Sequence, residues 1–259
     1  MRSSSAGLTE PSRGAALVTG GSRRIGRAIA LALAERGHDV AIHHRSSAED
    51  AEAVAAEVRA LGRRAAVVAA DLTVEAQVRA LTPAATQALG PLSVLVNNAS
   101  VFEDDRVGSL ERASWDWHME TNLRAPLVLM EAFAAQAPDG SAVVNLLDQR
   151  VLKPDPRFVS YALSRNGLWW ATRTMAQALA PRIRVNGVGP GPTLKSIHQT
   201  EAEFAVEAAA VPLGHGADPD DIASAVLYLI DARSVTGQMI AVDGGQHLAW
   251  QTPDILPEP

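Results

Sequence analysis

Tyr161 and Arg165 are a pair of side chains whose types and spacing suggest acid–base chemistry. A separation of four residues places both on the same face of a helix. The tyrosine hydroxyl keeps its proton at neutral pH, and a neighbouring cation lowers its pKa toward the working range of a general acid. We therefore expect Tyr161 to give a proton to a substrate. A half-buried tyrosine with only a packing role is the alternative.

Asp148 lies thirteen residues before Tyr161, directly after the largely apolar segment 142–147. An ionised carboxylate accepts hydrogen bonds but cannot donate one, so it would repel the alkoxide that develops when a ketone is reduced. It suits a substrate with N–H donors, or a ring nitrogen that is protonated during hydride addition. An aspartate that only forms a turn after a strand is the alternative.

A glycine-rich turn follows the first apolar run and reads TGGSRRIG at residues 19–26. Glycines let backbone N–H groups approach a pyrophosphate, and the N-terminus of the following helix favours its negative charge. The expected cofactor contacts in this turn are Gly20, Ser22, Arg23, Ile25 and Gly26. An ordinary tight strand–helix turn is the alternative.

The end of the second apolar run indicates which dinucleotide is bound. An NAD site usually carries an acidic residue here for the adenosine ribose, whereas this chain has His44, Arg45 and Ser46. A guanidinium and a hydroxyl suit the 2′-phosphate of NADP, and so does Arg23 in the glycine-rich turn. We therefore expect NADPH/NADP as the cofactor; a solvated polar strand end is the alternative.

Short aliphatic runs alternate with longer helical patterns along the chain, which predicts the elements that position these residues. Expected strands are 15–19, 40–44, 65–70, 92–96, 142–147, 183–188 and 239–242. Expected helices are 25–36, 47–61 with a capping box from Ser47 to Asp50, 74–89, 115–120, 123–136, 159–180 and 220–230. Strand–helix alternation predicts an α/β fold: one Rossmann-like, doubly wound parallel sheet of about seven strands, with helices on both faces.

Length and composition limit the other possibilities. The 259 residues fit one domain at 14–250, with tails at 1–13 and 251–259. A net charge of −6 argues against a nucleic-acid binder, and the absence of cysteine excludes disulfides, thiolate metal sites and a cysteine nucleophile. No metal-binding pattern, signal peptide or membrane-spanning run occurs, so we expect no metal and a cytoplasmic protein without membrane partners.

A series of motifs, in order along residues 14–248, resembles those of the short-chain dehydrogenase/reductase family. The loop at residues 19–26 resembles the family's TGxxxGxG turn. The other matches are Asp71-Leu72, Asn97-Asn98-Ala99, Asn122, Pro190-Gly191-Pro192-Thr193, Val235-Thr236-Gly237-Gln238 and Val242-Asp243-Gly244-Gly245. Together these motifs are highly specific, although none would be specific alone.

The resemblance implies further roles in the site. The family's chemistry rests on a Tyr-x-x-x-Lys motif and a serine thirteen residues before the tyrosine. Here Tyr161 matches, Arg165 replaces the lysine, and Asp148 replaces the serine. Arg165 keeps the charge that tunes Tyr161 and could hold the nicotinamide ribose, but it cannot act as a proton-relay amine. A degraded site in which Arg165 points to solvent is the alternative.

The remaining implied roles concern a relay water and the cofactor. Asn122 matches the family's helix asparagine and would hold a water in the proton relay. The further implied cofactor contacts are Asp71, Leu72, Asn98, Ala99, Ser100, Pro190, Gly191 and Thr193.

One branch of the family, the pteridine reductases, shares a more particular set of residues with this chain. That set comprises Arg24, Ser100, Phe102, Asp148 and Tyr161. In that branch the phenylalanine and the nicotinamide sandwich a flat pterin, while Arg24 and Ser100 would line the pocket. The resemblance implies NADPH-dependent reduction of a C=N bond in a pterin-like small molecule. Loop packing is the alternative for Phe102.

Two alternatives to this function remain open, together with two structural expectations. The first alternative is a broad carbonyl or 3-oxoacyl reductase, against which Asp148 argues. The second is a catalytically weak NADP-binding sensor or scaffold, which Arg165 favours. We expect residues 194–211 to form a helical lid over the substrate. Family members commonly form tetramers, so a homo-oligomer is implied.

Overall fold

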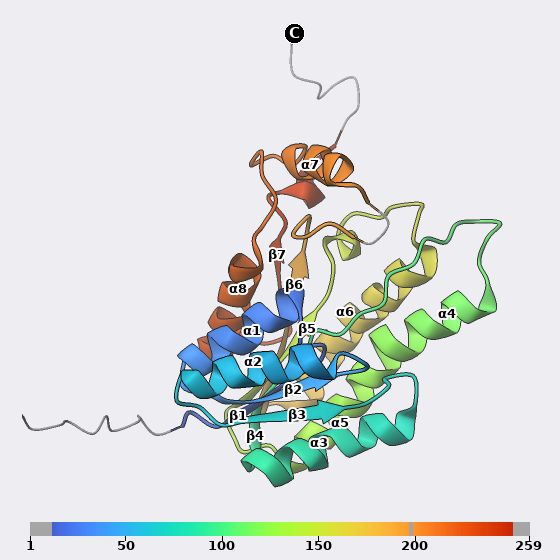
Figure 1. The fold of residues 1–259 in the computed structure, drawn as a ribbon. Helices are drawn as coiled ribbons and strands as arrows, with labels where there is room; N and C mark the ends of the chain where they lie inside the picture. Colours follow the sequence, from blue (N-terminus) through green and yellow to red (C-terminus); the bar gives the residue numbers. More distant parts are fainter. Residues whose placement is uncertain (1–11, 197–198, 251–259) are drawn as a thin grey trace, which may run out of the picture.

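The computed structural model describes residues 12–196 and 199–250, and it contains one sheet of seven parallel strands (Figure 1). The strand order is β3-β2-β1-β4-β5-β6-β7. The bounds are β1 Ala15–Val18, β2 Asp39–His44, β3 Ala65–Ala69, β4 Leu92–Asn97, β5 Ser141–Leu146, β6 Ile183–Pro190 and β7 Met239–Val242. The predicted sheet is therefore confirmed.

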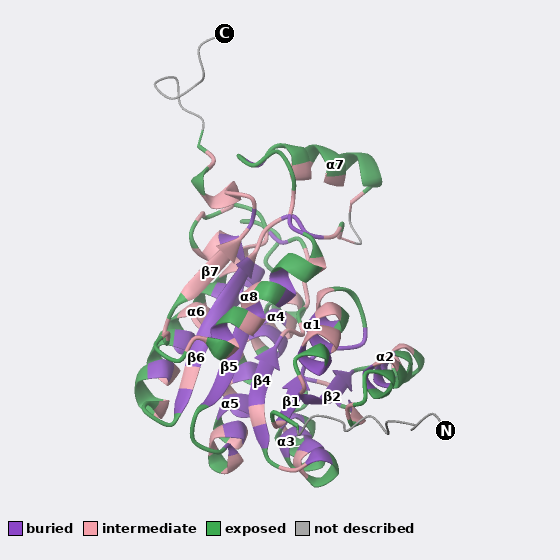
Figure 2. Cartoon of the chain, turned by 90° about the vertical axis from the view of Figure 1, so that its left-hand side faces the viewer, coloured by how far each residue is buried: buried purple, intermediate pink, exposed green. Residues whose placement is uncertain are grey.

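Helices cover both faces of the sheet, and side chains alternate between the two cores. Leu17 of β1 packs on one face and Val18 on the other, as expected for a strand buried on both sides. One face carries α1 Arg24–Glu35, α2 Ala48–Ala60 and α8 Pro219–Asp231. The other carries α3 Glu75–Leu89, α5 Ala125–Gln136 and α6 Val159–Leu179. Figure 2 shows the buried strands between these exposed helix surfaces.

The strand order reverses between β1 and β4, so the loops that follow these two strands diverge to opposite sides of the sheet. In open parallel sheets such a reversal opens a crevice at the carboxyl ends of the strands, where ligands bind. The glycine-rich turn follows β1 and the Asn97-Asn98-Ala99 motif follows β4. The fold therefore brings the two motifs to one place.

The helices predicted at 115–120 and 123–136 form one continuous path, which corrects the expected break. Helix α4, Arg112–Met119, runs through the π-helical turn Glu120–Arg124 into α5. Within that turn the backbone N–H of Ala125 donates to the carbonyl of Glu120, five residues earlier. Pro126 has no N–H to donate to the carbonyl four residues before it, which favours the wider turn.

Two predictions of local structure need correction. The capping box at Ser47 does not form, because the Ser47 hydroxyl pairs with that of Ser22 at 2.9 Å and Asp50 pairs with Arg23. The predicted tails at 1–13 and 251–259 lie outside the described residues except for 12 and 13. At that end Arg13 donates to the carbonyl of Gly37 and pairs with Asp231, so it is attached to the domain.

The segment between β6 and α8 extends beyond the carboxyl edge of the sheet (Figures 1 and 2). It carries α7, Glu201–Ala209, which begins with a capping box between Thr200 and Glu203 and has no buried residue. The predicted helical lid at 194–211 therefore contains a helix; residues 197 and 198 lie outside the described part. None of the described helices is long and apolar enough to span a membrane.

Candidate active site

The turn after β1 is shaped by two close backbone approaches. Gly20 has a φ of 61°, and a Cβ there would lie 3.1 Å from the Cα of Ala99. Gly26 lies in the first turn of α1, and a Cβ there would lie 2.1 Å from the carbonyl oxygen of Gly20. The turn therefore folds onto α1 only because both positions lack a side chain. The turn leads closely into the N-terminus of α1, which fits the negative charge of a pyrophosphate.

Asn98 and Thr19 fasten the loop after β4 to this turn. The Asn98 side-chain amide donates to the carbonyls of Thr19 at 2.8 Å and Gly20 at 3.2 Å. In return the Thr19 hydroxyl accepts from the backbone N–H groups of Asn98 at 2.9 Å and Ala99 at 3.0 Å. These bonds join the two loops on either side of the crevice.

His43 supports the same turn, and the sequence analysis did not assign it to the site. Its Nδ1 accepts from the backbone N–H of Gly20 at 3.0 Å, and its Nε2 lies 3.1 Å from the carbonyl of Ala70. Burial lowers the pKa of His43 to about 4, so the ring is neutral and can accept at one nitrogen while donating from the other. The signal that could have identified it is a histidine pointing inward from a strand end beside the glycine turn.

A cavity of about 430 Å³ lies beside the turn and collects the predicted cofactor residues. His44, Arg45, Ser46 and Asp71 line its outer part. The buried Nδ1 of His44 has no hydrogen-bond partner among the described residues, and the Arg45 guanidinium lies 5.8 Å from the ring centroid of Trp117. Hydrogen bonds from Thr73 lower the pKa of Asp71, which therefore stays ionised. An unpaired ring nitrogen and an exposed cation suit a dinucleotide phosphate and ribose.

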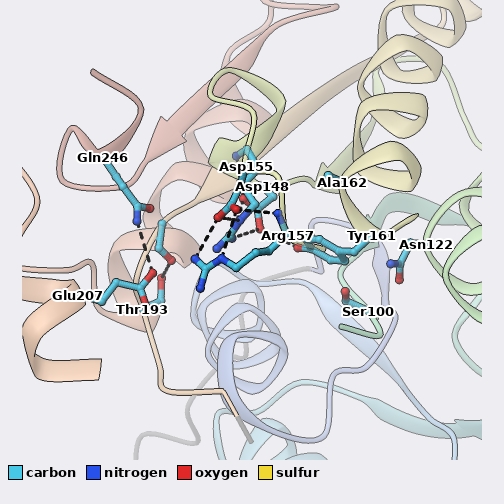
Figure 3. A network of polar contacts seen from close by, with 12 residues as sticks. Ser100, Asn122, Asp148, Asp155, Arg157, Tyr161, Ala162, Thr193, Glu207 and Gln246 are labelled. Atoms are coloured by element: carbon cyan, nitrogen blue, oxygen red, sulfur yellow. Dashed lines mark hydrogen bonds and ion pairs between the residues drawn. The ribbon is translucent and has the colours of Figure 1, made fainter. Parts of the chain in front are cut away.

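Tyr161 and Asp148 meet at the carboxyl edge of β5, as Figure 3 shows. The Tyr161 hydroxyl donates to Oδ2 of Asp148 at 2.7 Å, and only 5% of Tyr161 is exposed. Burial and the Asp148 charge raise the pKa of Tyr161, while Arg165 acts in the opposite direction. The expectation that Arg165 lowers the pKa of Tyr161 is thus right for its own contribution, but burial and Asp148 outweigh it.

Arg165 points into the protein, not to solvent. Its Nη1 donates to the carbonyl of Leu146 at 2.9 Å, and its guanidinium carbon lies 5.4 Å from the ring centroid of Tyr161. The side chain is buried, so the Coulomb interaction with Tyr161 is weakly screened by water. The geometry retains the cation beside the tyrosine despite the replacement of lysine.

Asn122 lies in the π-helical turn and uses its whole amide on protein partners. Its oxygen accepts from the N–H of Val101 at 3.0 Å. Its nitrogen donates to the carbonyl of Val101 at 3.0 Å and to the hydroxyl of Ser164 at 3.2 Å. The two protons of that nitrogen are therefore committed, and what Asn122 does in this structure is hold the loop after β4 against α6.

The start of α6 is held by a buried polar network that the sequence analysis also missed. Phe158 precedes the helix with a left-handed backbone, φ 59°. The N–H of Ser160 donates to Oδ1 of Asp105 at 3.1 Å, its hydroxyl contacts Oδ2 of the same carboxylate, and Nδ1 of His118 lies 2.7 Å from that hydroxyl. The loop at Asp105 and helix α4 thereby fix the helix turn that presents Tyr161.

The second cavity, of about 1030 Å³, continues from the first. Phe102 stacks on Phe158 with ring centroids 4.3 Å apart and meets Tyr161 edge to face at 4.8 Å. Arg24 lines this cavity and donates to the carbonyls of Leu194 at 3.2 Å and Lys195 at 2.9 Å. Arg24 thus ties the lid segment to the phosphate turn.

The two cavities contain every predicted site residue except Asn122. The first holds Gly20, Ser22, Arg23, Gly26, His44, Ser46, Asp71, Leu72 and Ala99, and the second holds Phe102, Asp148, Tyr161, Arg165, Pro190, Gly191 and Thr193. Both are lined by Arg24, Ile25, Arg45, Asn98 and Ser100. Among the described residues, no cluster of three or more His, Cys, Asp or Glu side chains is placed to hold a metal ion.

Comparison with known proteins identifies the family. Residues 20–247 match the family model described as enoyl-(acyl carrier protein) reductase. The 3-oxoacyl-[acyl-carrier-protein] reductase FabG of Staphylococcus aureus is 33% identical over 240 residues, which are 90% of this chain and 98% of that protein. The chain belongs to the short-chain dehydrogenase/reductase family.

Solved structures of other short-chain dehydrogenases/reductases are also similar to this chain. The FolM alternative dihydrofolate reductase 1 of Brucella suis, crystallised with NADP, is 48% identical, with a TM-score of 0.90 over 94% of this chain and 99% of that one. A short-chain dehydrogenase of Burkholderia cenocepacia, also with NADP, is 35% identical, with a TM-score of 0.87 over 92% of this chain and 99% of that one.

Proposed function

We propose that this protein reduces a C=N bond of a dihydropterin-like heterocycle with NADPH. At the coarser level, the protein is an NADP-dependent oxidoreductase of the short-chain dehydrogenase/reductase family. The observation that carries the finer proposal is the hydrogen bond from Tyr161 to Asp148 inside an aromatic-walled cavity. A carboxylate at this place suits a substrate that presents N–H groups.

The residues of the first cavity would hold the cofactor. The turn from Gly20 to Gly26 would bind the pyrophosphate, and His44, Arg45 and Ser46 would bind the 2′-phosphate. The adenine and nicotinamide ends would lie against Asp71, Leu72, Asn98, Ala99, Ser100, Pro190, Gly191 and Thr193. When bound, NADPH supplies the hydride.

The chain's own side chains would supply the proton. Tyr161 gives its hydroxyl proton to the ring nitrogen next to the reduced carbon, and Asp148 holds that hydroxyl in position beforehand. Arg165 stabilises the phenolate that remains, because its guanidinium lies beside the ring in a buried site. Asn122 acts through the loop after β4, which it fixes by two bonds to Val101.

Phe102 would form one wall of a slot for a flat ring. Phe158 covers one face of Phe102, so the substrate would use the opposite face, with Arg24 and Ser100 at the edge of the slot. Aromatic stacking of this kind contributes about 0.5–1.5 kcal/mol beyond the area that it buries. The name of the FolM relative, an alternative dihydrofolate reductase, supports the same substrate class.

A second candidate is a 3-oxoacyl or broad carbonyl reductase, which the FabG relatives favour. The experiment is NADPH oxidation by the purified chain with dihydropterin, dihydrofolate, a 3-oxoacyl thioester and simple ketones, compared with the Tyr161→Phe variant. We expect turnover of the dihydropterins. Turnover of the carbonyl compounds alone would exclude the pterin proposal, and no difference between wild type and variant would exclude a catalytic role for Tyr161.

We also propose that the enzyme is a homo-oligomer, and the family resemblance implies that it is a tetramer. Helix α6 leaves Leu163 and Trp170 exposed, and 66% of Trp170 faces solvent in a single chain. Covering large apolar side chains is a common consequence of symmetric association. Light scattering of the purified chain measures this directly, and a mass of one chain would refute it.

A further inference from the structure

Arg150 forms a second set of contacts to the carboxylate that holds Tyr161. It lies two residues after Asp148 in the short helix η2, Gln149–Val151, which Asp148 caps by accepting from the N–H of Arg150 at 2.8 Å. The Nη1 of Arg150 lies 3.4 Å from Oδ1 and 3.3 Å from Oδ2 of the same carboxylate. The Arg150 guanidinium and the Tyr161 hydroxyl therefore share one anion.

The surroundings of Arg150 keep it both charged and fixed. Only 15% of its side chain is exposed, and its guanidinium lies 5.3 Å from the ring centroid of Phe158 and 5.8 Å from that of Phe102. Burial opposes its charge, but attraction to Asp148 and Tyr161 outweighs burial and raises the pKa of Arg150. It is thus a permanent cation in the wall of the substrate cavity.

With a serine at position 148 and no arginine at position 150, Tyr161 would lie beside one cation, Arg165, and no anion. Replacing that serine by Asp148 adds a negative charge that opposes formation of the phenolate, and Arg150 adds a positive charge that cancels it. Counting Arg165, Arg150 and Asp148, the site keeps one net positive charge. The added carboxylate can then bind a substrate N–H without a large electrostatic penalty on proton transfer.

We propose that Arg150 is a positioning residue that neutralises Asp148, so that Tyr161 can release its proton although a carboxylate accepts its hydroxyl. The inference rests on the proposed function for its catalytic meaning, but the charge coupling itself is a property of the folded chain. It concerns a residue two positions from Asp148 that no motif in the sequence singled out.

Several other charged groups face the same place from neighbouring elements. Asp155 lies 3.8 Å from Nε of Arg150, and Glu207 of α7 also acts on Arg150 through its charge. His118 of α4 lies with its ring centroid 6.0 Å from that of Tyr161, and burial lowers the pKa of His118, so it is neutral at pH 7. These groups are common to all the variants below, so differences between the variants report on positions 148 and 150.

The test is a titration of Tyr161 by its tyrosinate absorbance, with NADP⁺ added. The chain has two tyrosines, and the other, Tyr228, is 56% exposed on α8, so Tyr228→Phe provides a parent protein in which only Tyr161 absorbs. Into this parent we would introduce Asp148→Ser alone, and Asp148→Ser combined with either Arg150→Gln or Arg150→Lys. Arg157→Gln on the Asp148→Ser background is the matched control, because Arg157 pairs with Asp155 and is half exposed.

We expect Asp148→Ser to lower the midpoint for Tyr161 by about one pH unit or more, because a cation is left uncompensated. Adding Arg150→Gln to Asp148→Ser should raise the midpoint again by about one pH unit, whereas adding Arg150→Lys or Arg157→Gln should leave it where Asp148→Ser alone has it. Equal midpoints with and without Arg150→Gln would overturn the proposal. So would a lysine variant that behaves like the glutamine variant, since the charge would then be irrelevant.

Activity measurements separate this inference from the proposed function. With whichever substrate the wild type reduces, Arg150→Gln alone should lower kcat at neutral pH about tenfold or more at unchanged NADPH affinity, and Arg150→Lys should restore most of it. A wild type that reduces no dihydropterin would refute the proposed function, and the titration would still decide the coupling. If Arg150→Gln alone fails to fold, the double variant with Asp148→Ser, which buries no unpaired charge, carries the same comparison.

Discussion

Replacing Gly26 by alanine tests whether the close contact between α1 and the phosphate turn positions the cofactor site. The added Cβ would lie 2.1 Å from the carbonyl oxygen of Gly20 and 2.6 Å from the side-chain nitrogen of Asn98. Both groups are held from other directions, because that nitrogen also bonds to Thr19. The Gly20 carbonyl and the Asn98 amide therefore cannot move aside as the end of a flexible side chain would. The turn itself must move by about 1 Å to restore an ordinary contact.

The expected cost follows from two contributions. Overpacking a rigid site costs about 1–3 kcal/mol, and weakening one of the Asn98 hydrogen bonds costs about 1 kcal/mol more. The sum, about 2–4 kcal/mol, corresponds to a fall of roughly 5–15 °C in Tm for a domain of this size. NADPH affinity should fall at least about tenfold, because the displaced N–H groups are those that would face the pyrophosphate.

The assay is thermal unfolding together with an NADPH fluorescence titration, and Gly167→Ala is the matched control. Gly167 also lies in a helix, but a Cβ there would meet only the tip of Leu123, at 2.9 Å. Alanine should therefore leave the Tm unchanged or raise it, since alanine favours helix by about 1 kcal/mol over glycine. If Gly26→Ala kept both the wild-type Tm and the wild-type NADPH affinity, the close contact would have no role in binding.

Three further predictions concern the same cleft. Tyr161→Phe should lower kcat about 100-fold or more while the NADPH dissociation constant measured by fluorescence stays the same. A loss of NADPH affinity as large as the loss of kcat would indicate a structural defect instead. Arg24→Gly should relieve a left-handed backbone, φ 52°, worth about 1 kcal/mol, yet raise the substrate KM by releasing the lid carbonyls; an unchanged KM would refute the tie. Because the folded-state pKa of His43 is about 4, below its usual value of 6.5, its contribution to stability is complete above pH 6.5 and is lost as the pH falls toward 4. Tm measured against pH should therefore decline more steeply over that window in the wild type than in His43→Gln, and parallel curves would contradict this assignment.

The strand–helix pattern was sufficient to predict the sheet, and the family resemblance was sufficient to predict that Tyr161 and Asp148 belong to one site. Aliphatic strands alternating with helices leave few topologies, and strand ends of a parallel sheet converge on one edge. Asp148 follows the end of β5 and Tyr161 lies in the first turn of α6, and the 2.7 Å hydrogen bond forms between them.

Contacts between distant side chains could not be predicted in the same way. Ser47 fits a local capping pattern, but Ser22 from another loop takes its hydroxyl. His43 lies at the end of β2, and its role depends on Gly20 in the glycine-rich turn and on Ala70, directly after β3. Arg150 lies in η2, within the connection between β5 and α6, and the path of that connection determines which carboxylate it meets. In each case the partner is chosen by tertiary structure, about which local sequence says little.

The π-helical turn at Glu120–Arg124 contains one residue more than an α-helical turn, and this residue determines how α4 is rotated relative to α5. Removing a single residue there would restore an even helix, but it would rotate everything before the turn by about 100° relative to α5. Trp117 would then turn away from Arg45, and His118 would leave the network around Ser160. The π-helical turn thus sets the rotation of α4 relative to α5. It allows α5 to pack on the sheet while α4 places Trp117 and His118 beside the active site.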